Sequence, residues 1–528
     1  MRIGIDVGGT HTDAVLLDNE TILATNKSLT TSDVASGIID SLNTLLKKAS
    51  VPAKNISAVM IGTTQFTNAI VERRQLSDIA VIRLALPSGK GCPPMIEWPD
   101  ELIKAINPSI YECHGGYLYD GYPVADINFQ EIEAAIADIK HKGIKSVAIA
   151  SAFATMNAEP ELQLANLINT EIPDCEITLS HQIGSIGLLE RENAAILNAT
   201  LRPFAQKVVN AFESALKQHA FSCPFFISQN DGTLMNADFV RAYPALTFAS
   251  GPTNSLRGAY KLTGKDNAIV VDIGGTTSDI GVLQNGFPRE SNRIIKVGGV
   301  RTNFRMPDIN AVGLGGGSIV RDEGKRIGPD SCGHKLVEEA LVFNGNTLTT
   351  TDIIVANGNA MIGESENVKN VPHEVVHNAI NTMRETLNHH IEIMKPDNTP
   401  VPVILVGGGA ALIQGELPAA SEVIRPENAD VANAIGAAIA QIGGEAESML
   451  SYRSMSRNQA IFNVTQLATD KAVAAGANKN TVRTIDIEET EVPYMDGDIR
   501  RVRVKVVGEI ATVERADAQL SEQQTGAY

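Results

Sequence analysis

Residues 270–283, VVDIGGTTSDIGVL, are a near-copy of residues 3–17, IGIDVGGTHTDAVLL, about half a chain earlier. When the two are aligned, Asp272 falls on Asp6 and Asp279 falls on Asp13. In each copy an apolar run stops at an Asp, turns through Gly-Gly-Thr and resumes as a second apolar run, which predicts a β-hairpin. We interpret the pair as an internal duplication with a shared role, the alternative being two ordinary hairpin turns.

The chemistry of these turns suits a phosphate. Because glycine has no Cβ, backbone N–H groups at the turn can approach an anion closely, and the neighbouring hydroxyls can donate to it. The Asp that leads each turn can hold Mg²⁺ through water. Two such turns, each preceded by an Asp at a strand end, therefore predict a nucleotide held by its phosphates together with magnesium.

Length and composition narrow the class of protein. A chain of 528 residues is too long for one core and should divide into two or three domains. The formal net charge of −17 argues against a nucleic-acid or anionic-membrane surface, and the 43% hydrophobic content is that of an ordinary globular protein. The N-terminus enters a strand directly, without a signal peptide, so we expect a cytoplasmic protein. Its five scattered cysteines fit reduced thiols.

Further candidate residues lie at other strand ends and on a long helix. Thr63 and Thr64 follow a short strand at 58–61 and precede a helix, so they either face a ligand cleft or cap that helix. Glu190 and Arg191 begin a long helical tract at the crossover between domains, where they either line the cleft or lie on a solvated face.

Two later glycine runs are predicted to complete the nucleotide site. Gly315 and Gly316 lie in VGLGGGSIV, residues 312–320, where consecutive glycines must bring the backbone near something or make a sharp turn. Residues 401–411, VPVILVGGGAA, predict a buried strand that runs into Gly407, Gly408 and Gly409 before a helix. Bare backbone at such a junction can accept the purine and ribose of adenosine. A small-residue helix at 426–441 is expected to close the domain.

Two stretches depart from the βα alternation. Residues 86–128 are rich in Pro, Gly and aromatic residues and predict an insertion or lid; Cys92, Cys113 and His114 within it could suggest a metal, but no second close pair gives ligand spacing. Residues 444–528 predict a helix at 464–475, a hairpin from 481–493 and 500–507, and a disordered polar tail.

Taken together, the two Asp-x-Gly-Gly-Thr hairpins and the late triple glycine resemble the ATPase fold of actin, sugar kinases and heat-shock chaperones. Longer stretches of the sequence resemble one branch of this fold, the hydantoinase A/5-oxoprolinase family, over nearly the whole chain. The stretches that carry the resemblance are GIDVGGTHTDAVLLD, IGTTQFTNAIVER, LLERENAAILNATLRP, NDGTLMNADFVRAYPALTFASGPTNSLRGA, DIGGTTSDIGVL, DINAVGLGGGSIVRDEGKRIGPDS and VPYMDGDIRRVRVKVVGE.

The resemblance implies an α/β fold of duplicated ribonuclease H-like domains around a nucleotide cleft, followed by a small α+β region. The expected domains are 1–190, 191–443 and 444–528. It also implies ATP-dependent opening of a cyclic amide such as a hydantoin, oxoproline or lactam, in which ATP phosphorylates the amide oxygen so that water can attack. ATP and Mg²⁺ are the implied cofactors.

Residue roles follow from the same resemblance. Asp6 and Asp272 would hold Mg²⁺, and with Asp279 they are the candidate catalytic residues. The residues that would bind phosphate are Gly8, Gly9, Thr10, Thr12, Gly274, Gly275, Thr276 and Thr277, while Gly407 to Gly409 would flank adenosine. Asn310 is a candidate substrate residue, but many relatives have His in this place in DINAVG, which puts any proton transfer or metal role there in doubt.

The chain lacks the second half that is fused on in 5-oxoprolinases. It therefore resembles a separate A subunit, for which the family implies a B-type partner subunit; a homo-oligomer is also open. Two other functions remain as alternatives. One is a small-molecule kinase of the same fold, and the other is an ATP-driven activator or a carboxylase subunit, although the chain has no C-x-x-C pair for the bridging cluster that one class of activators needs.

Overall fold

Both glycine-rich stretches form the hairpins that their sequences predict. The computed structural model describes residues 1–8, 11–19, 21–30, 34–119, 121–291, 294–492 and 497–511. Strands β1 (Arg2–Val7) and β2 (His11–Asp18) are antiparallel with Asp6 opposite Asp13. Strands β11 (Ala268–Ile273) and β12 (Ser278–Gln284) repeat this arrangement with Asp272 opposite Asp279.

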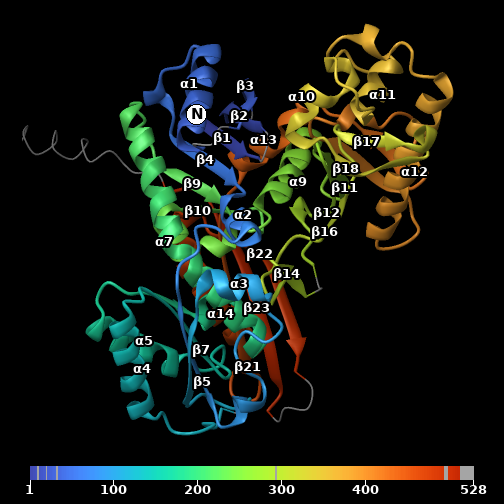
Figure 1. Ribbon diagram of the computed structural model, residues 1–528. Helices are drawn as coiled ribbons and strands as arrows, with labels where there is room; N and C mark the ends of the chain where they lie inside the picture. Colours follow the sequence, from blue (N-terminus) through green and yellow to red (C-terminus); the bar gives the residue numbers. More distant parts are fainter. Residues whose placement is uncertain are drawn as a thin grey trace, which may run out of the picture. The chain divides into compact units, whose positions relative to one another are not determined.

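Each hairpin belongs to a larger mixed sheet (Figure 1). The first sheet has the order β10-β9-β4-β1-β2-β3, and the second has the order β13-β12-β11-β19-β20, with β16 paired to β12. In both sheets the strand before the glycine turn also pairs with a parallel strand, β4 or β19. The remaining strands of these sheets are β3 Thr21–Leu29, β4 Ala58–Thr63, β9 Phe225–Ser228, β10 Leu234–Asn236, β13 Phe287–Pro288, β16 Ile309–Val312, β19 Val401–Val406 and β20 Ala420–Ile424. The predicted fold class, two related mixed α/β lobes, is confirmed.

Two helices made largely of small residues cross where these lobes meet. Helix α9 (Ser250–Thr263) packs against β11 and β12, while α13 (Ala432–Ile439) packs against β1, β2 and β4. The helices also contact each other at very close range: a Cβ on Gly258 would lie 1.8 Å from the carbonyl oxygen of Ala432. Helix α13 is shorter than the predicted 426–441, because residues before it form a turn ending in a 3₁₀ segment.

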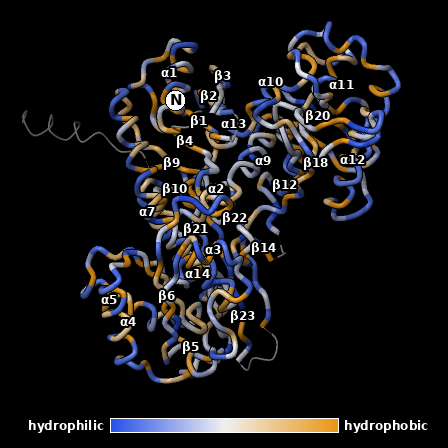
Figure 2. Tube along the Cα trace, viewed as in Figure 1, coloured by the Kyte–Doolittle hydropathy of each residue, from blue (hydrophilic) through white to orange (hydrophobic). Residues whose placement is uncertain are grey.

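A third sheet takes one of its four strands, β6, from the region where the sequence predicts an aperiodic insertion. Its strands are all parallel in the order β6-β5-β7-β8, with the bounds β5 Ala80–Leu86, β6 Ser109–His114, β7 Ser146–Ser151 and β8 Glu176–Leu179. The insertion predicted at 86–128 is therefore part of a small α/β layer. The edge strand β6 escaped detection because its residues are mostly half-exposed and mix apolar with polar side chains. Helices α4 (Phe129–Lys142) and α5 (Glu159–Glu171) contain both apolar and polar residues, which Figure 2 shows as mixed colours.

Helix α7 (Leu188–Gln218) is continuous for 31 residues and contacts β7 and β8 as well as α1. Strands β9 and β10 follow it in sequence but pair in the sheet of β4, so this sheet extends past residue 190. The boundary at 190/191 stays a prediction. Other elements of this unit are α1 Val34–Ala49, α2 Gln65–Glu72, α3 Asp100–Ile106, α6 Ser180–Ile183, α8 Ala237–Ala242, β14 Ile295–Val297, β15 Val300–Thr302, β17 Ser318–Arg321, β18 Arg326–Ser331, α10 Leu336–Glu339, α11 Thr350–Ala356 and α12 His373–Met394.

The chain divides into two compact units, Met1–Ala440 and Gln441–Tyr528. In the second unit β21 (Ile442–Ser451), β23 (Ile499–Gly508) and β22 (Arg483–Glu491) form an antiparallel sheet, and α14 (Arg457–Ala474) packs against β21 and β23. The helix begins earlier than the predicted 464. The connection predicted around 495 falls partly on residues 493–496, which lie outside the described residues, as does the predicted tail.

Candidate functional site

The Asp that leads the first hairpin is buried in a network of amides. Asp6 is 6% exposed, and a Cβ on Gly62, its neighbour on β4, would lie 2.3 Å from its Oδ1 atom. From α13, Asn433 Nδ2 donates to Asp6 Oδ2 at 3.0 Å and to Asp13 Oδ2 at 3.1 Å. From α9, Asn254 Nδ2 lies 3.5 Å from Asp6 Oδ1. These two helices therefore fix the position of the carboxylate.

The Asp that leads the second hairpin, Asp272, is held by α9. Ser255 Oγ donates to Asp272 Oδ2 at 2.5 Å, and Ser255 follows Asn254 directly in the chain. Two consecutive residues of α9 thus contact the leading carboxylates of both hairpins. The two hairpins, far apart in sequence, are brought together at one helix.

The clustered carboxyl groups affect one another's ionisation. Burial and the neighbouring Asp13 raise the pKa of Asp6 to about 7, with a further contribution from Asp272. Burial, followed by the charge of Asp272, raises the pKa of Asp279 to about 7. Burial also raises the pKa of Asp272. Carboxyl groups in this state gain from a bound cation, because a cation offsets both the desolvation and the mutual repulsion.

Two glycine-rich loops pack directly on the tip of the second hairpin. The N–H of Gly316 donates to the carbonyl of Gly274 at 3.0 Å, and the N–H of Gly409 donates to that of Ile273 at 2.7 Å. Side chains do not fit at these contacts: a Cβ on Gly315 would lie 2.6 Å from the Thr276 nitrogen. Gly407 has φ +84°, and a Cβ there would lie 2.2 Å from Asp272 Oδ1. The predicted glycine runs therefore meet at one place.

Parts of this tip remain open. Gly275, Thr276 and Thr277 are exposed, and a Cβ on Gly275 or on Gly408 would meet nothing within 4 Å. After Gly409 the chain makes only a short 3₁₀ turn, Ala410–Leu412, in place of the predicted helix. The loop geometry leaves room for a ligand beside the second hairpin.

The first hairpin shows a similar turn. The N–H of Gly8 donates to the carbonyl of His11 at 2.9 Å, as the N–H of Gly274 does to that of Thr277. Thr30 Oγ1 donates to the carbonyl of Gly8 at 2.9 Å and lies 3.2 Å from Thr12 Oγ1. Gly9 and Thr10, both predicted phosphate residues, lie outside the described residues.

The threonines after β4 lie close to this network but serve the next helix. Thr63 is buried, and its Oγ1 accepts from the N–H of Gln65 at 3.3 Å. Thr64 occupies the N-terminal position of α2 and accepts from Asn68 Nδ2 at 3.4 Å. Thr63 thus contacts the first residue of α2, but Thr64, which precedes α2, makes no side-chain cap hydrogen bond with it. A role of the threonines in the cleft stays a prediction, while Gly62 is the residue that touches Asp6.

Three other predicted residues make their contacts elsewhere. Arg191 is buried beside the four-stranded sheet, where its Nε donates to Ser180 Oγ at 2.9 Å. Glu190 accepts from Arg301 at 2.9 Å. Asn310 lies opposite Ile280, one residue out of phase with Asp279, and its Nδ2 atom lies 3.0 Å from His390 Nδ1 on α12. Since successive side chains of a strand alternate faces, Asn310 faces away from Asp279.

The donor set fits a magnesium ion that is carried by a phosphate ligand. Carboxylate oxygens are the ligands that Mg²⁺ prefers, and Mg²⁺ usually keeps several waters and few protein ligands. Asp6 and Asp272 supply such oxygens. Within the described ranges, no group of three or more His, Cys, Asp or Glu side chains is placed to hold a metal by itself.

Cys92, Cys113 and His114 do not form a metal site in the described part of the chain. Cys113 is buried in the core of the four-stranded sheet, and His114 Nδ1 lies 2.8 Å from Glu131 Oε1.

The described chain contains no helix with the length and apolar character needed to cross a membrane.

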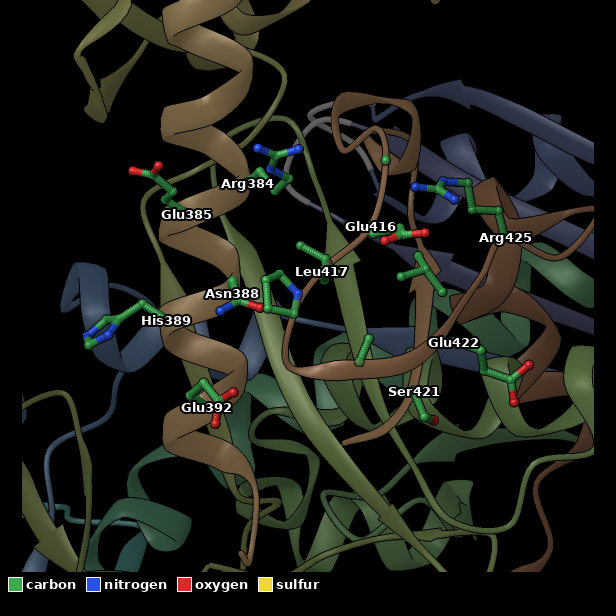
Figure 3. A pocket seen from close by; sticks show the side chains of 14 residues that line it. Arg384, Glu385, Asn388, His389, Glu392, Glu416, Leu417, Ser421, Glu422 and Arg425 are labelled. Atoms are coloured by element: carbon green, nitrogen blue, oxygen red, sulfur yellow. The ribbon is translucent and has the colours of Figure 1, made fainter. Parts of the chain in front are cut away.

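A separate groove lies between α12 and residues 415–425 (Figure 3). It has a volume of about 1100 Å³ and charges of both signs, including Arg384, Glu392 and Arg425. None of the predicted site residues lines this groove, so it is distinct from the carboxylate cluster.

Sequence reasoning missed several residues of the network. The alignment of the two copies already pairs Asp13 with Asp279, which could have singled out Asp13. Asn433 falls within the predicted small-residue helix, and Asn254 and Ser255 fall within one of the stretches that carry the family resemblance, but no role was predicted for any of the three. Their contacts with Asp6 and Asp272 join residues up to 427 positions apart, and no local pattern in the sequence reports such contacts.

Comparisons with known proteins give one consistent family. Residues 2–172 match the sequence model described as the hydantoinase/oxoprolinase N-terminal region, and residues 191–362 match the one described as hydantoinase/oxoprolinase. The chain is 24% identical to caprolactamase subunit alpha of Pseudomonas jessenii, over 68% of this chain and 54% of that protein. It is 25% identical to the acetophenone carboxylase gamma subunit of Aromatoleum aromaticum, over 67% and 53%. The chain spans about half the length of the curated relatives it matches.

A solved structure agrees with the fold. The crystal structure of the ATP-dependent caprolactamase from Pseudomonas jessenii superposes with a TM-score of 0.78 at 17% identity, covering 97% of this chain and 88% of that one. At this level of identity the likeness shows a shared fold and nothing finer.

Proposed function

Because the chain belongs to the hydantoinase/oxoprolinase family, we propose that it is the ATP-using A subunit of an enzyme that opens a cyclic amide. The substrate class would be a hydantoin, an oxoproline or a lactam. The relatives' names support this class, since one is a caprolactamase subunit and the similar solved structure is an ATP-dependent caprolactamase. The cytoplasm stays the expected location.

The observation that carries the proposal is the contact of α9 with both hairpins. Asn254 and Ser255 are consecutive, yet they contact Asp6 and Asp272, which lead the two glycine turns. A triphosphate is large enough to span two such turns, and its negative charge needs backbone N–H groups and hydroxyls on more than one side. The paired turns supply these groups from two directions.

The proposed chemistry begins with an unreactive amide. Transfer of the γ-phosphoryl group to the amide oxygen would break its bond to ADP and give an imidate phosphate, whose carbon water can attack. Bound Mg²⁺ would neutralise charge on the phosphates during this transfer. Asp6 and Asp272 would hold the ion, partly through water. Asn254, Asn433 and Ser255 keep these carboxylates in place.

The glycine loops would position the nucleotide. Gly8, Gly9, Thr10 and Thr12 would contact phosphate from one side, and residues 274–277 with Gly315 and Gly316 from the other. Gly407 to Gly409 would flank adenosine. Thr63, Thr64, Glu190, Arg191 and Asn310 have weaker support as substrate residues, since their contacts serve a helix start, an ion pair or a core.

A partner subunit is part of the proposal. The names of two relatives, a subunit alpha and a gamma subunit, describe components of larger enzymes. We expect a B-type subunit to be needed for complete hydrolysis. The likeness to a carboxylase subunit keeps a related ATP-dependent carboxylation as a second candidate.

The test is phosphate release from MgATP by the purified chain, with and without a B-type subunit, against a panel of hydantoins, 5-oxoproline and lactams. Release that depends on a cyclic amide supports the proposal. Release that depends instead on a ketone and bicarbonate supports the carboxylase. A stable phosphorylated product indicates a kinase, and release that ignores every substrate contradicts all three and favours an ATP-driven activator.

A further inference from the structure

Lys27 places a positive charge within the carboxylate cluster. It lies on β3 directly opposite Asp13, so that Asp6, Asp13 and Lys27 form one row across β1, β2 and β3. Its Nζ atom donates to Asp13 Oδ1 at 2.7 Å and to the carbonyl of Asp430 at 3.2 Å. The side chain is 34% exposed, whereas that of Asp13 is 5% exposed. The ammonium group therefore reaches from the buried carboxylate towards solvent.

Lys27 belongs to the hydrogen-bond network around the first leading carboxylate. Asp13 accepts from Lys27 and also from Asn433, and Asn433 donates to Asp6 as well. A cation held in this network lies beside the carboxylate that would hold Mg²⁺ next to the phosphates.

Among the described residues, Lys27 has acceptors for only two of its donors. An ammonium group has three N–H donors. Asp13 and Asp430 accept two of them, and the third has no acceptor among the residues that the structure describes. A partly exposed ammonium with a free donor can bind an anionic oxygen without breaking its existing contacts.

The second hairpin has no equivalent cation. There the matching row runs from Asp272 to Asp279 to Ala311, so alanine stands where the first copy has lysine. The second copy folds into the same hairpin without this charge. The hairpin architecture therefore does not demand the lysine.

We propose that Lys27 is a phosphate ligand that binds the di- or triphosphate of the nucleotide directly. This inference rests on the proposed function, since it assumes that nucleotide phosphates lie between the two turns. The competing explanation is that Lys27 only balances the charge of Asp13. The two explanations differ in what happens when both charges are removed together.

The test is calorimetric titration of MgATP, MgADP and adenosine into the full chain and its variants. For Lys27→Met we expect about tenfold or greater loss of affinity for MgATP and MgADP, because a charge-assisted contact is lost, and unchanged affinity for adenosine. Lys27→Arg keeps the charge and should retain most of the affinity. The double variant Asp13→Asn/Lys27→Met should stay as weak as Lys27→Met. Lys48→Met is a matched control, since Lys48 Nζ contacts β3 at Asn26 but touches no carboxylate of the cluster.

Thermal melting of each variant shows that it is folded. If Lys27→Met binds MgATP as the unmodified chain does, or if the double variant recovers the lost affinity, Lys27 is not a phosphate ligand and only this inference fails. If the unmodified chain binds neither MgATP nor MgADP, the proposed function fails as well.

Discussion

Four aspartates and one lysine dominate the chemistry at the scale of single residues. Asp6, Asp13, Asp272 and Asp279 form two cross-strand pairs, and Lys27 accompanies the first pair only. The raised pKa values of Asp6, Asp272 and Asp279 disfavour the folded state at neutral pH, because these groups ionise less readily in the folded chain than in the unfolded one. The cluster is therefore a place where the fold gives up stability, which is typical of binding sites.

The raised pKa of Asp279 should make the free energy of unfolding depend on pH. The pKa of Asp279 rises from 3.8 to about 7 on folding. Its contribution to the free energy of unfolding is therefore favourable below the unfolded pKa and is lost as the pH rises through about 7. Asp279→Asn removes the titration. We expect the variant to match the unmodified chain near pH 4 and to be more stable at pH 8, by up to about 4 kcal/mol for three pKa units.

Denaturant unfolding at both pH values, without nucleotide, measures the difference. An Asp279→Asn variant whose stability tracks that of the unmodified chain at every pH would show that Asp279 ionises freely in the folded state.

Asp272 should be needed for turnover but not for folding. We expect Asp272→Asn to lower ATP hydrolysis by about 100-fold or more, because the leading carboxylate would hold the metal. Its melting temperature should stay the same or rise, since a group with a raised pKa is removed. Full turnover by a folded variant would remove Asp272 from the site.

At the scale of elements, the sequence was most informative where structure is local. Each hairpin could be predicted because an apolar run, an Asp and two glycines lie within fourteen or fifteen consecutive residues. The glycine runs at 315–317 and 407–409 were predicted to complete the nucleotide site, but their contacts with the second hairpin tip are seen only in the structure. The edge strand β6 was missed, because its mostly half-exposed residues lack the continuous apolar run of a buried strand.

The crossing of α9 and α13 should be sensitive to one methyl group. A Cβ on Gly436 would lie 1.8 Å from the carbonyl oxygen of Asn254, the residue whose side chain contacts Asp6. We expect Gly436→Ala to destabilise the chain by roughly 1–3 kcal/mol and to weaken nucleotide binding. Gly251→Ala on α9 is the control, since a Cβ there meets nothing within 4 Å. Equal stability of the two variants in urea unfolding would contradict the close crossing.

Two similar histidine–glutamate contacts lie beside the four-stranded sheet, one between β6 and α4 and the other between α5 and α6, and they differ in burial. Glu161 accepts from the N–H and Nδ1 of His181 at 3.1 and 2.6 Å and also from Ser180, whereas Glu131 accepts from the same two atoms of His114 at 2.9 and 2.8 Å. The side chain of Glu161 is 0% exposed and that of Glu131 is 32% exposed.

This difference predicts unequal effects of the same substitution. Glu161→Gln places an amide donor against donors in a buried network and should cost about 2–4 kcal/mol of unfolding free energy. Glu131→Gln, which keeps access to water, should cost less than about 1 kcal/mol. Chemical denaturation of both variants tests this, and equal losses would mean that burial does not decide the cost.

At the scale of the whole molecule, the duplication accounts for the arrangement of the first unit. Each copy builds a hairpin, a mixed sheet and a parallel strand beside the leading Asp, and α9 and α13 link the two copies. The sequence indicated the two copies and the family. It could not indicate that Asn254, Ser255 and Asn433 bind the carboxylates, because these contacts exist only after distant segments have packed.

The central claim is that the two Asp-Gly-Gly-Thr turns bind the phosphates of one nucleotide from opposite sides. A crystal structure with Mg²⁺ and a non-hydrolysable ATP analogue tests it most directly. We predict phosphate oxygens in contact with both residues 8–12 and residues 274–277, with the metal ion near Asp6 and Asp272. A nucleotide bound elsewhere, for example in the groove beside α12, or held by one turn alone, would contradict the account.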